Sequence, residues 1–109
     1  MSMSEKFQYK GQVSYQKIIK ASDPTLVLFK LKLIDHPLNP TNLIGKEFTA
    51  LIARKALTFM FEVIIGDYIL IYGHFNAKNQ FITEKYLIEK RMPRSYEKII
   101  KQLPPHKNL

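Results

Sequence analysis

The sequence predicts a mainly β protein, built as one small closed barrel of five strands with a short helix before the fourth strand. Three observations support this fold class. Apolar and polar residues alternate in several separate segments, as they do in strands with one buried face. Gly11 and Gly73 interrupt two of these segments, and glycine lets a strand bend sharply. A run with helical spacing, Arg54 to Ile64, precedes a Gly66-Asp67 turn that leads into the next alternating segment.

The first strand is expected to run from Phe7 to about residue 20, after a flexible N-terminus of residues 1–6. Its apolar face consists of alternate residues: Phe7, Tyr9, Gly11, Val13 and Tyr15. We expect Tyr9 and Tyr15 to be core residues because they share this face with Val13. Lys10 lies on the opposite, polar face. Residues 21–25 form a turn by composition.

The second strand is expected over Leu26 to Asp35 and the third over Lys46 to Ala53, with a proline-containing loop between them. One face of the second strand is uniformly apolar and predicts core: Val27, Phe29, Leu31 and Leu33. The other face places Lys30 and Lys32 on an exposed sheet surface. In the third strand, Phe48 is expected inside the barrel.

The helix over Arg54 to Ile64 is expected to plug one end of the barrel. Its helical spacing is carried by Leu57, Met60, Phe61 and Ile64. We expect Phe61 to be structural, because it belongs to this apolar stripe.

The fourth strand is expected over Gly66 to Phe75, with Ile69 and Ile71 in the core. The opposite face of that strand points outward and carries Tyr68, Tyr72 and His74. A hairpin turn at residues 76–79 leads into the fifth strand, Gln80 to Lys90, which contains Lys85.

Residues 92–109 are expected to form a basic C-terminal helix followed by a loose tail. The helical stripe consists of Tyr96, Ile99, Ile100 and Leu103, and Pro104-Pro105 ends the helix. This stripe either caps an open end of the barrel or forms a symmetric contact with a second copy. We expect a homo-oligomer, a dimer or larger.

This order of elements is that of the five-stranded Greek-key barrel called the oligonucleotide/oligosaccharide-binding (OB) fold. The main structural alternative is an SH3-like barrel, which usually needs fewer than the 11 residues from Arg54 to Ile64 between its third and fourth strands. At 109 residues the chain is expected to form a single domain, over residues 7–91.

The composition points to an anionic partner. The chain has 17 Lys and Arg against 9 Asp and Glu, and its pI is near 9.7. Such a basic balance is typical of proteins that bind nucleic acid. There are no cysteines, which excludes disulfides, thiolate zinc sites and a cysteine nucleophile. No secretory signal or membrane-spanning run is visible, so we expect a soluble cytoplasmic protein without membrane contact.

Three motifs carry a resemblance to a known family. They are Gly11-x-Val13, then Phe29-x-Leu31-x-Leu33-x-Asp35, then Gly66-Asp67-x-Ile69-x-Ile71-x-Gly73 after the helix. Together they resemble the single-stranded DNA-binding proteins of bacteria and their phages, over roughly residues 7 to 90. The last motif is also similar to anticodon-binding barrels of aminoacyl-tRNA synthetases and to nucleic-acid-binding domains of polymerases.

Two departures from the bacterial housekeeping proteins refine this resemblance. Those proteins end in an acidic tail that recruits replication enzymes, whereas this chain ends Pro104-Pro105-His106-Lys107-Asn108-Leu109. They also carry tryptophans among their base-stacking residues, and this chain has none. The resemblance therefore implies a phage-encoded or plasmid-encoded variant, or a primosomal protein of the same fold, acting in the host cytoplasm if phage-encoded.

Single-strand binding requires cations that follow the phosphates and exposed rings that stack on bases. The candidate nucleic-acid-binding residues are Lys10, Lys30, Lys32, Tyr68, Tyr72, His74 and Lys85. An equally open alternative is that the outward tyrosines pack under the C-terminal helix or in a subunit contact.

No catalytic or metal-binding pattern is present. His36, His74 and His106 are too scattered for a metal site, and no phosphate-binding glycine loop or nucleophile motif occurs. We therefore expect no enzyme activity and no cofactor. The leading function is sequence-independent binding of single-stranded DNA in replication or recombination, possible partners being the proteins of those processes. The alternatives are an RNA- or tRNA-binding barrel and a protein-interaction module.

Overall fold

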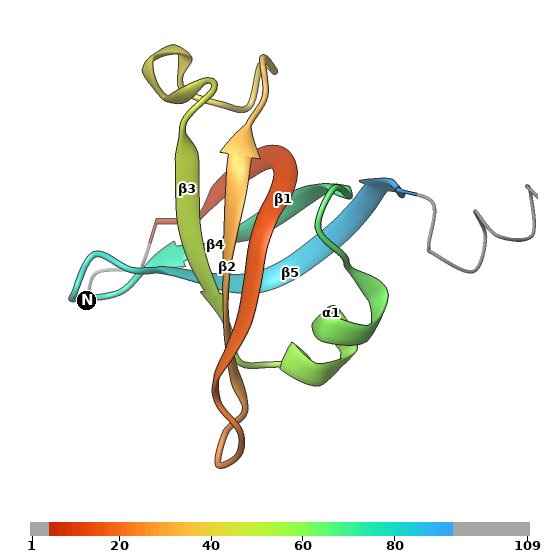
Figure 1. Cartoon of the computed structure of the whole chain (residues 1–109). Coiled ribbons are helices and arrows are strands. Elements are labelled where there is room, and N and C mark those ends of the chain that lie inside the picture. The colour runs from red at the N-terminus through yellow and green to blue at the C-terminus, as the bar shows by residue number, and fades with distance from the viewer. Residues whose placement is uncertain (1–4, 93–109) are drawn as a thin grey trace, which may run out of the picture.

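Five strands close into a barrel in the spatial order β1-β2-β3-β5-β4 (Figure 1). The strands are β1 (Phe7–Lys20), β2 (Leu26–Leu33), β3 (Glu47–Ile52), β4 (Tyr68–Phe75) and β5 (Phe81–Lys90). The helix α1 (Ala56–Glu62) lies between β3 and β4 in the chain, and a 3₁₀ turn, η1 (Thr41–Leu43), lies in the β2–β3 loop. This computed structural model describes residues 5–92.

Neighbouring strands are antiparallel except for β3 and β5, which are parallel. The parallel contact is short, with Ala50 opposite Phe81 and Leu51 opposite Ile82. A closed barrel of this topology, with one helix between its third and fourth strands, is the OB fold. The predicted fold class is therefore confirmed. The predicted C-terminal helix, Arg94 to Leu103, lies outside the described residues.

The barrel interior is filled by the alternating apolar residues that the sequence predicts. Predicted core residues that are buried are Val27, Phe29, Leu31, Leu33, Ile69 and Ile71. Phe48 is partly buried and packs against this core. Its ring lies 4.2 Å from that of the buried Tyr9, measured between centroids. The prediction that Tyr9 is a core residue is confirmed.

Glycine is required at Gly73 because β4 and β5 approach each other closely there. A Cβ atom at this position would lie 1.9 Å from the carbonyl oxygen of Ile82. Gly11 meets a similar limit, since its Cβ would lie 2.6 Å from the carbonyl oxygen of Lys32. Real Cβ atoms do not come so close to backbone, so both glycines permit the tight coiling of the barrel.

The Gly66-Asp67 turn ties three parts of the fold together. Asp67 is fully buried, and its carboxylate accepts hydrogen bonds from the backbone N–H groups of Ile64 (3.1 Å) and Met92 (2.7 Å). Its carbonyl accepts a bond from the N–H of Val13, and the N–H of Gly66 donates to the carbonyl of Val13. One turn therefore joins the segment after α1, the middle of β1 and the end of β5.

The face that α1 buries overlaps the predicted one only at Met60, which packs against the core. Ala56 and Phe59 are buried, and the Phe59 ring packs on Phe29 with centroids 4.6 Å apart. Leu57 is exposed and Phe61 is 88% exposed, so the prediction that Phe61 is structural is wrong. Both sets of residues have helical spacing, and the barrel interior selects the set that carries Phe59.

The prediction that Tyr15 is a core residue is also wrong, since its side chain is 39% exposed. The register of β1 against β2 shifts between Val13, which lies opposite Leu31, and Tyr15, which lies opposite Lys30. An extra residue at such a bulge reverses which side chains point inward. Tyr15 therefore points outward, on the same face as Lys30.

Replacing Asp67 with Ala should destabilise the fold strongly. The substitution leaves the partly buried N–H groups of Ile64 and Met92 without their carboxylate acceptor. We expect the free energy of unfolding to fall by about 2–4 kcal/mol, because two hydrogen bonds to a charged, fully buried carboxylate are lost. Urea denaturation followed by circular dichroism measures the change. Asp35→Ala removes an exposed carboxyl and is the control; equal midpoints for the two variants would contradict the proposed role of Asp67.

Candidate nucleic-acid interface

Three tyrosine–lysine pairs lie on the outer surface of the barrel. The ammonium nitrogen of Lys30 lies 5.5 Å from the ring centroid of Tyr15. Lys85 lies 5.9 Å from the Tyr72 ring, and Lys90 lies 5.9 Å from the Tyr68 ring. In each pair the two residues are opposite each other on neighbouring strands. Each ring is thus accompanied by a cation, within the range of a cation–π contact.

The strand β1 connects the outer faces of the two halves of the barrel. Its first part pairs with β4, and its second part pairs with β2. Gln12 belongs to both pairings, because it lies opposite Tyr68 on β4 and opposite Lys32 on β2. Cross-strand partners share a face, so Tyr68 and Lys32 flank Gln12 on the outer surface. We call the outward residues of this region the β1 strip: Tyr15, Lys30, Lys32, Gln12, Lys10, Tyr68, Tyr72, Lys85 and Lys90.

Two of the seven predicted site residues are engaged by carboxylates. The Lys10 ammonium forms a salt bridge with Glu89 at 2.7 Å. His74 Nδ1 lies 2.5 Å from a carboxylate oxygen of Glu84, which also forms a salt bridge with Lys6. The hydrogen bonds from Lys6 and from His74 lower the pKa of the Glu84 carboxyl. Lys10 is therefore partly neutralised by Glu89, and the His74 ring is held by Glu84.

The remaining predicted cations have no such partner. Within residues 5–92, no salt bridge involves Lys30, Lys32 or Lys85. Lys90, which was not among the predicted residues, also forms no salt bridge within residues 5–92. These four ammonium groups can contact phosphate without first breaking an ion pair.

Sequence reasoning missed Tyr15 and Lys90. Tyr15 is outward only because of the bulge in β1, which no periodicity reveals. The strand β5 has a similar register shift, between Thr83 and Lys85, and a second one before Lys90. Lys90 faces Tyr68 as a result, so its place also depends on an irregularity of the strand.

The β1–β2 hairpin projects beyond the barrel (Figure 1). Its outer part exposes the apolar side chains of Ile18 and Ile19 between Lys17 and Lys20. This combination was also not assigned from the sequence, although the run Lys17-Ile18-Ile19-Lys20 is a visible signal. The hairpin continues the outer face that carries the Tyr15–Lys30 pair.

The described part of the chain shows no group of three or more metal-ligating side chains. Nor does any helix within residues 5–92 have the length and apolar character that crossing a bilayer requires.

The fold is similar to those of solved single-stranded DNA-binding proteins. One is the mitochondrial single-stranded DNA-binding protein Rim1 of S. cerevisiae, with a TM-score of 0.62 and 8% sequence identity. That match covers 84% of this chain and 100% of Rim1. Another is the small single-stranded DNA-binding protein from Streptomyces coelicolor, with a TM-score of 0.61, 13% identity and coverage of 86% of this chain and 99% of that protein. No family model and no curated protein matches the sequence. At such identities the likeness establishes a shared fold.

Proposed function

We propose that this protein binds single-stranded DNA independently of sequence, in DNA replication or recombination, as a phage- or mobile-element-type protein of the cytoplasm. The observation that carries the proposal is the set of three tyrosine–lysine pairs on the β1 strip. The fold shared with single-stranded DNA-binding proteins supports it. The protein acts by binding, without catalysis or a cofactor.

Each tyrosine–lysine pair supplies both interactions that a single strand needs. The ring offers a flat face on which any base can stack, so no particular base is selected. The ammonium group neutralises a phosphate and releases the cations condensed on the strand. In a duplex the base faces are covered by their neighbours, so stacking on Tyr68 and Tyr72 favours single strands.

The contributions of the candidate residues differ. Tyr68 and Tyr72 stack on bases, and Lys30, Lys32 and Lys85 contact phosphates. Lys10 and His74 lie beside this path and contribute less, because Glu89 and Glu84 already bind them. The pairs Tyr15–Lys30 and Tyr68–Lys90 extend the same chemistry beyond the residues predicted from the sequence.

Removing the two central rings should weaken binding. We expect Tyr68→Ala/Tyr72→Ala to lower the affinity for oligo-dT at least about tenfold, since each stacked base contributes about 1–3 kcal/mol. Fluorescence anisotropy of a labelled strand measures the affinity. The matched control is Phe61→Ala, which removes an exposed ring from α1, outside the β1 strip. Equal losses in the two variants would place the stacking surface elsewhere.

The salt dependence of binding tests the cations. Replacing Lys30 and Lys32 together with Ala should weaken binding to all sequences alike. It should also reduce the slope of log K against log salt concentration by about 1.4, because each phosphate contact on a single strand contributes about 0.7. Lys46→Ala/Lys78→Ala removes two exposed lysines outside the strip and should leave the slope unchanged. A wild-type slope in the Lys30/Lys32 variant would show that the cationic contact lies in another region.

Competition with other nucleic acids separates this function from its alternatives. Oligo-dT should compete strongly with the labelled strand, and duplex DNA should compete weakly. If RNA of equal length competes better than DNA, the protein is an RNA-binding barrel. If no nucleic acid binds, a protein-interaction module is the better description.

We also propose that the protein assembles with itself, because one OB barrel covers only about 4–16 nucleotides and pairing extends the bound length. Light scattering of the intact chain at micromolar concentration should give a mass of at least twice the 12.8 kDa of one chain. A mass near 12.8 kDa would exclude a stable dimer.

A further inference from the structure

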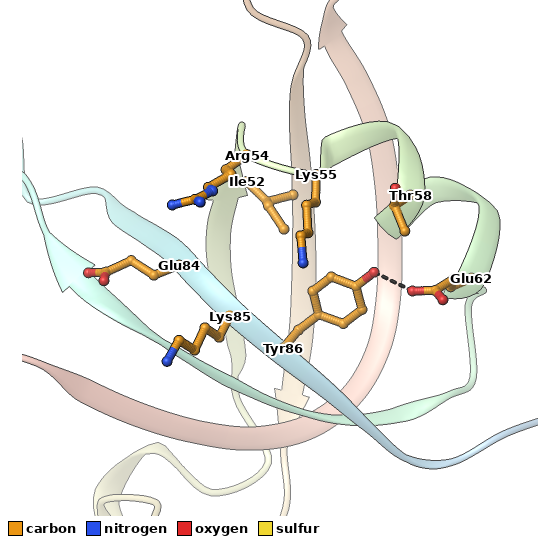
Figure 2. A pocket seen from close by; sticks show the side chains of 8 residues that line it. All are labelled: Ile52, Arg54, Lys55, Thr58, Glu62, Glu84, Lys85 and Tyr86. Carbon is orange, nitrogen blue, oxygen red and sulfur yellow. Dashed lines mark hydrogen bonds between the residues drawn. The ribbon is translucent and has the colours of Figure 1, made fainter.

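A cavity of about 450 Å³ opens where the barrel is least continuous. The strands β3 and β5 pair at Ala50 and Leu51 and then separate, and α1 lies beside the gap (Figure 1). The cavity is lined from the end of β3, from α1 and from β5 (Figure 2) by Ile52, Arg54, Lys55, Thr58, Glu62, Glu84, Lys85 and Tyr86. Cavities of this size accommodate small ligands.

Three cations line this cavity, and all three lack a salt bridge to residues 5–92: Arg54, Lys55 and Lys85. Lys55 has a left-handed backbone conformation, with φ of 62°, which is uncommon for a residue with a side chain. In Figure 2 its ammonium group extends toward the Tyr86 ring. The loop from β3 to α1 therefore holds this lysine over the cavity at some cost in backbone strain.

The acidic groups of the wall are already engaged. The Tyr86 hydroxyl donates to a carboxylate oxygen of Glu62, and Glu84 is bound by Lys6 and His74. Burial, and then the hydrogen bond to Glu62, raise the pKa of the Tyr86 hydroxyl far above its usual range, so it stays protonated as a donor. The three cations of the wall therefore outnumber its two carboxylates, of which Glu84 is already bound by Lys6 from outside the cavity.

We propose that this cavity binds the phosphomonoester of a nucleotide, as found at the end of a single strand or on a free mononucleotide. A phosphomonoester carries nearly two negative charges at neutral pH, and an internal phosphodiester carries one. Three cations line the cavity without a salt bridge to residues 5–92, and they suit the more highly charged group.

The position of Lys85 indicates that the phosphomonoester belongs to the end of a bound strand. This step rests on the proposed function. Lys85 lines the cavity and also lies over the Tyr72 ring of the β1 strip. A strand whose last base stacks on Tyr72 therefore has its terminal phosphate within reach of the cavity. Such a site would give a sequence-independent binder a preference for phosphorylated ends.

The first experiment compares oligo-dT strands with a phosphate at the 5′ end, a phosphate at the 3′ end, or hydroxyls at both ends. We expect one phosphorylated strand to bind about tenfold tighter than the hydroxyl strand. Arg54→Gln/Lys55→Asn should abolish this preference while the hydroxyl strand still binds; asparagine is chosen because it tolerates the left-handed conformation. Lys46→Gln/Lys78→Gln removes the same charge elsewhere and should retain the preference.

The second experiment tests the cavity without any strand. Thymidine monophosphate and thymidine are titrated into the labelled protein, and the NMR signals of Thr58 and Tyr86 are followed. Shifts that saturate with the monophosphate alone, and that vanish in Arg54→Gln/Lys55→Asn, support the phosphomonoester site even if strands fail to bind. Monophosphate binding without an end preference identifies the free nucleotide as the source. If neither an end preference nor monophosphate binding is observed, the proposal is wrong. Strand binding that persists in that case leaves the proposed function intact.

Discussion

A buried carboxylate in the turn before β4 sets the geometry on which both cationic surfaces depend. Asp67 binds the backbone N–H of Met92, two residues beyond the end of β5, and so fixes the end of that strand against the segment after α1. Lys85 and Tyr86 lie on the same strand. Because the carboxylate also holds Ile64, just beyond α1, it fixes the spacing between β5 and the helix. The cavity between β5 and the helix depends on this spacing. The pairing of β4 with β5, which places the tyrosine rings beside the lysines, depends on the same turn.

Register shifts then decide which side chains reach these surfaces. The shift in β1 turns Tyr15 outward to Lys30, and the shift in β5 leaves Lys85 outward while the next residue, Tyr86, faces α1. A one-residue shift leaves the sequence pattern intact and changes the exposed face. The sequence therefore could not show that Tyr15 is exposed. Nor could it show that Lys10 is paired with Glu89, since their meeting depends on how two distant strands align.

The fold itself was predictable, because its determinants are local. Alternation identified the buried faces of β2 and β4, and the Gly66-Asp67 turn marked the entry to β4. Glycine is needed at position 73 because the neighbouring backbone comes too close for a Cβ atom. The position of Gly73 within an alternating run is visible in the sequence. The helix was identified by spacing, but its buried face was not. Phe59 and Phe61 are both apolar, and only the shape of the barrel end chooses between them.

The tyrosine–lysine pairs raise the question of whether the cation obstructs the ring it accompanies. A cation–π contact at an exposed site contributes about 0.5–1 kcal/mol, whereas a stacked base contributes about 1–3 kcal/mol. A base can therefore displace the ammonium group of Lys85 from the Tyr72 ring with a net gain. The displaced cation remains on the neighbouring strand, opposite Tyr72. Under the proposed function it then contacts the phosphate of the stacked nucleotide. In the free protein the same contact restrains both side chains on the surface, so less side-chain entropy is lost on binding. Under the proposed function, the pair is one preorganised unit that contacts the phosphate charge and the base face and does not distinguish one base from another.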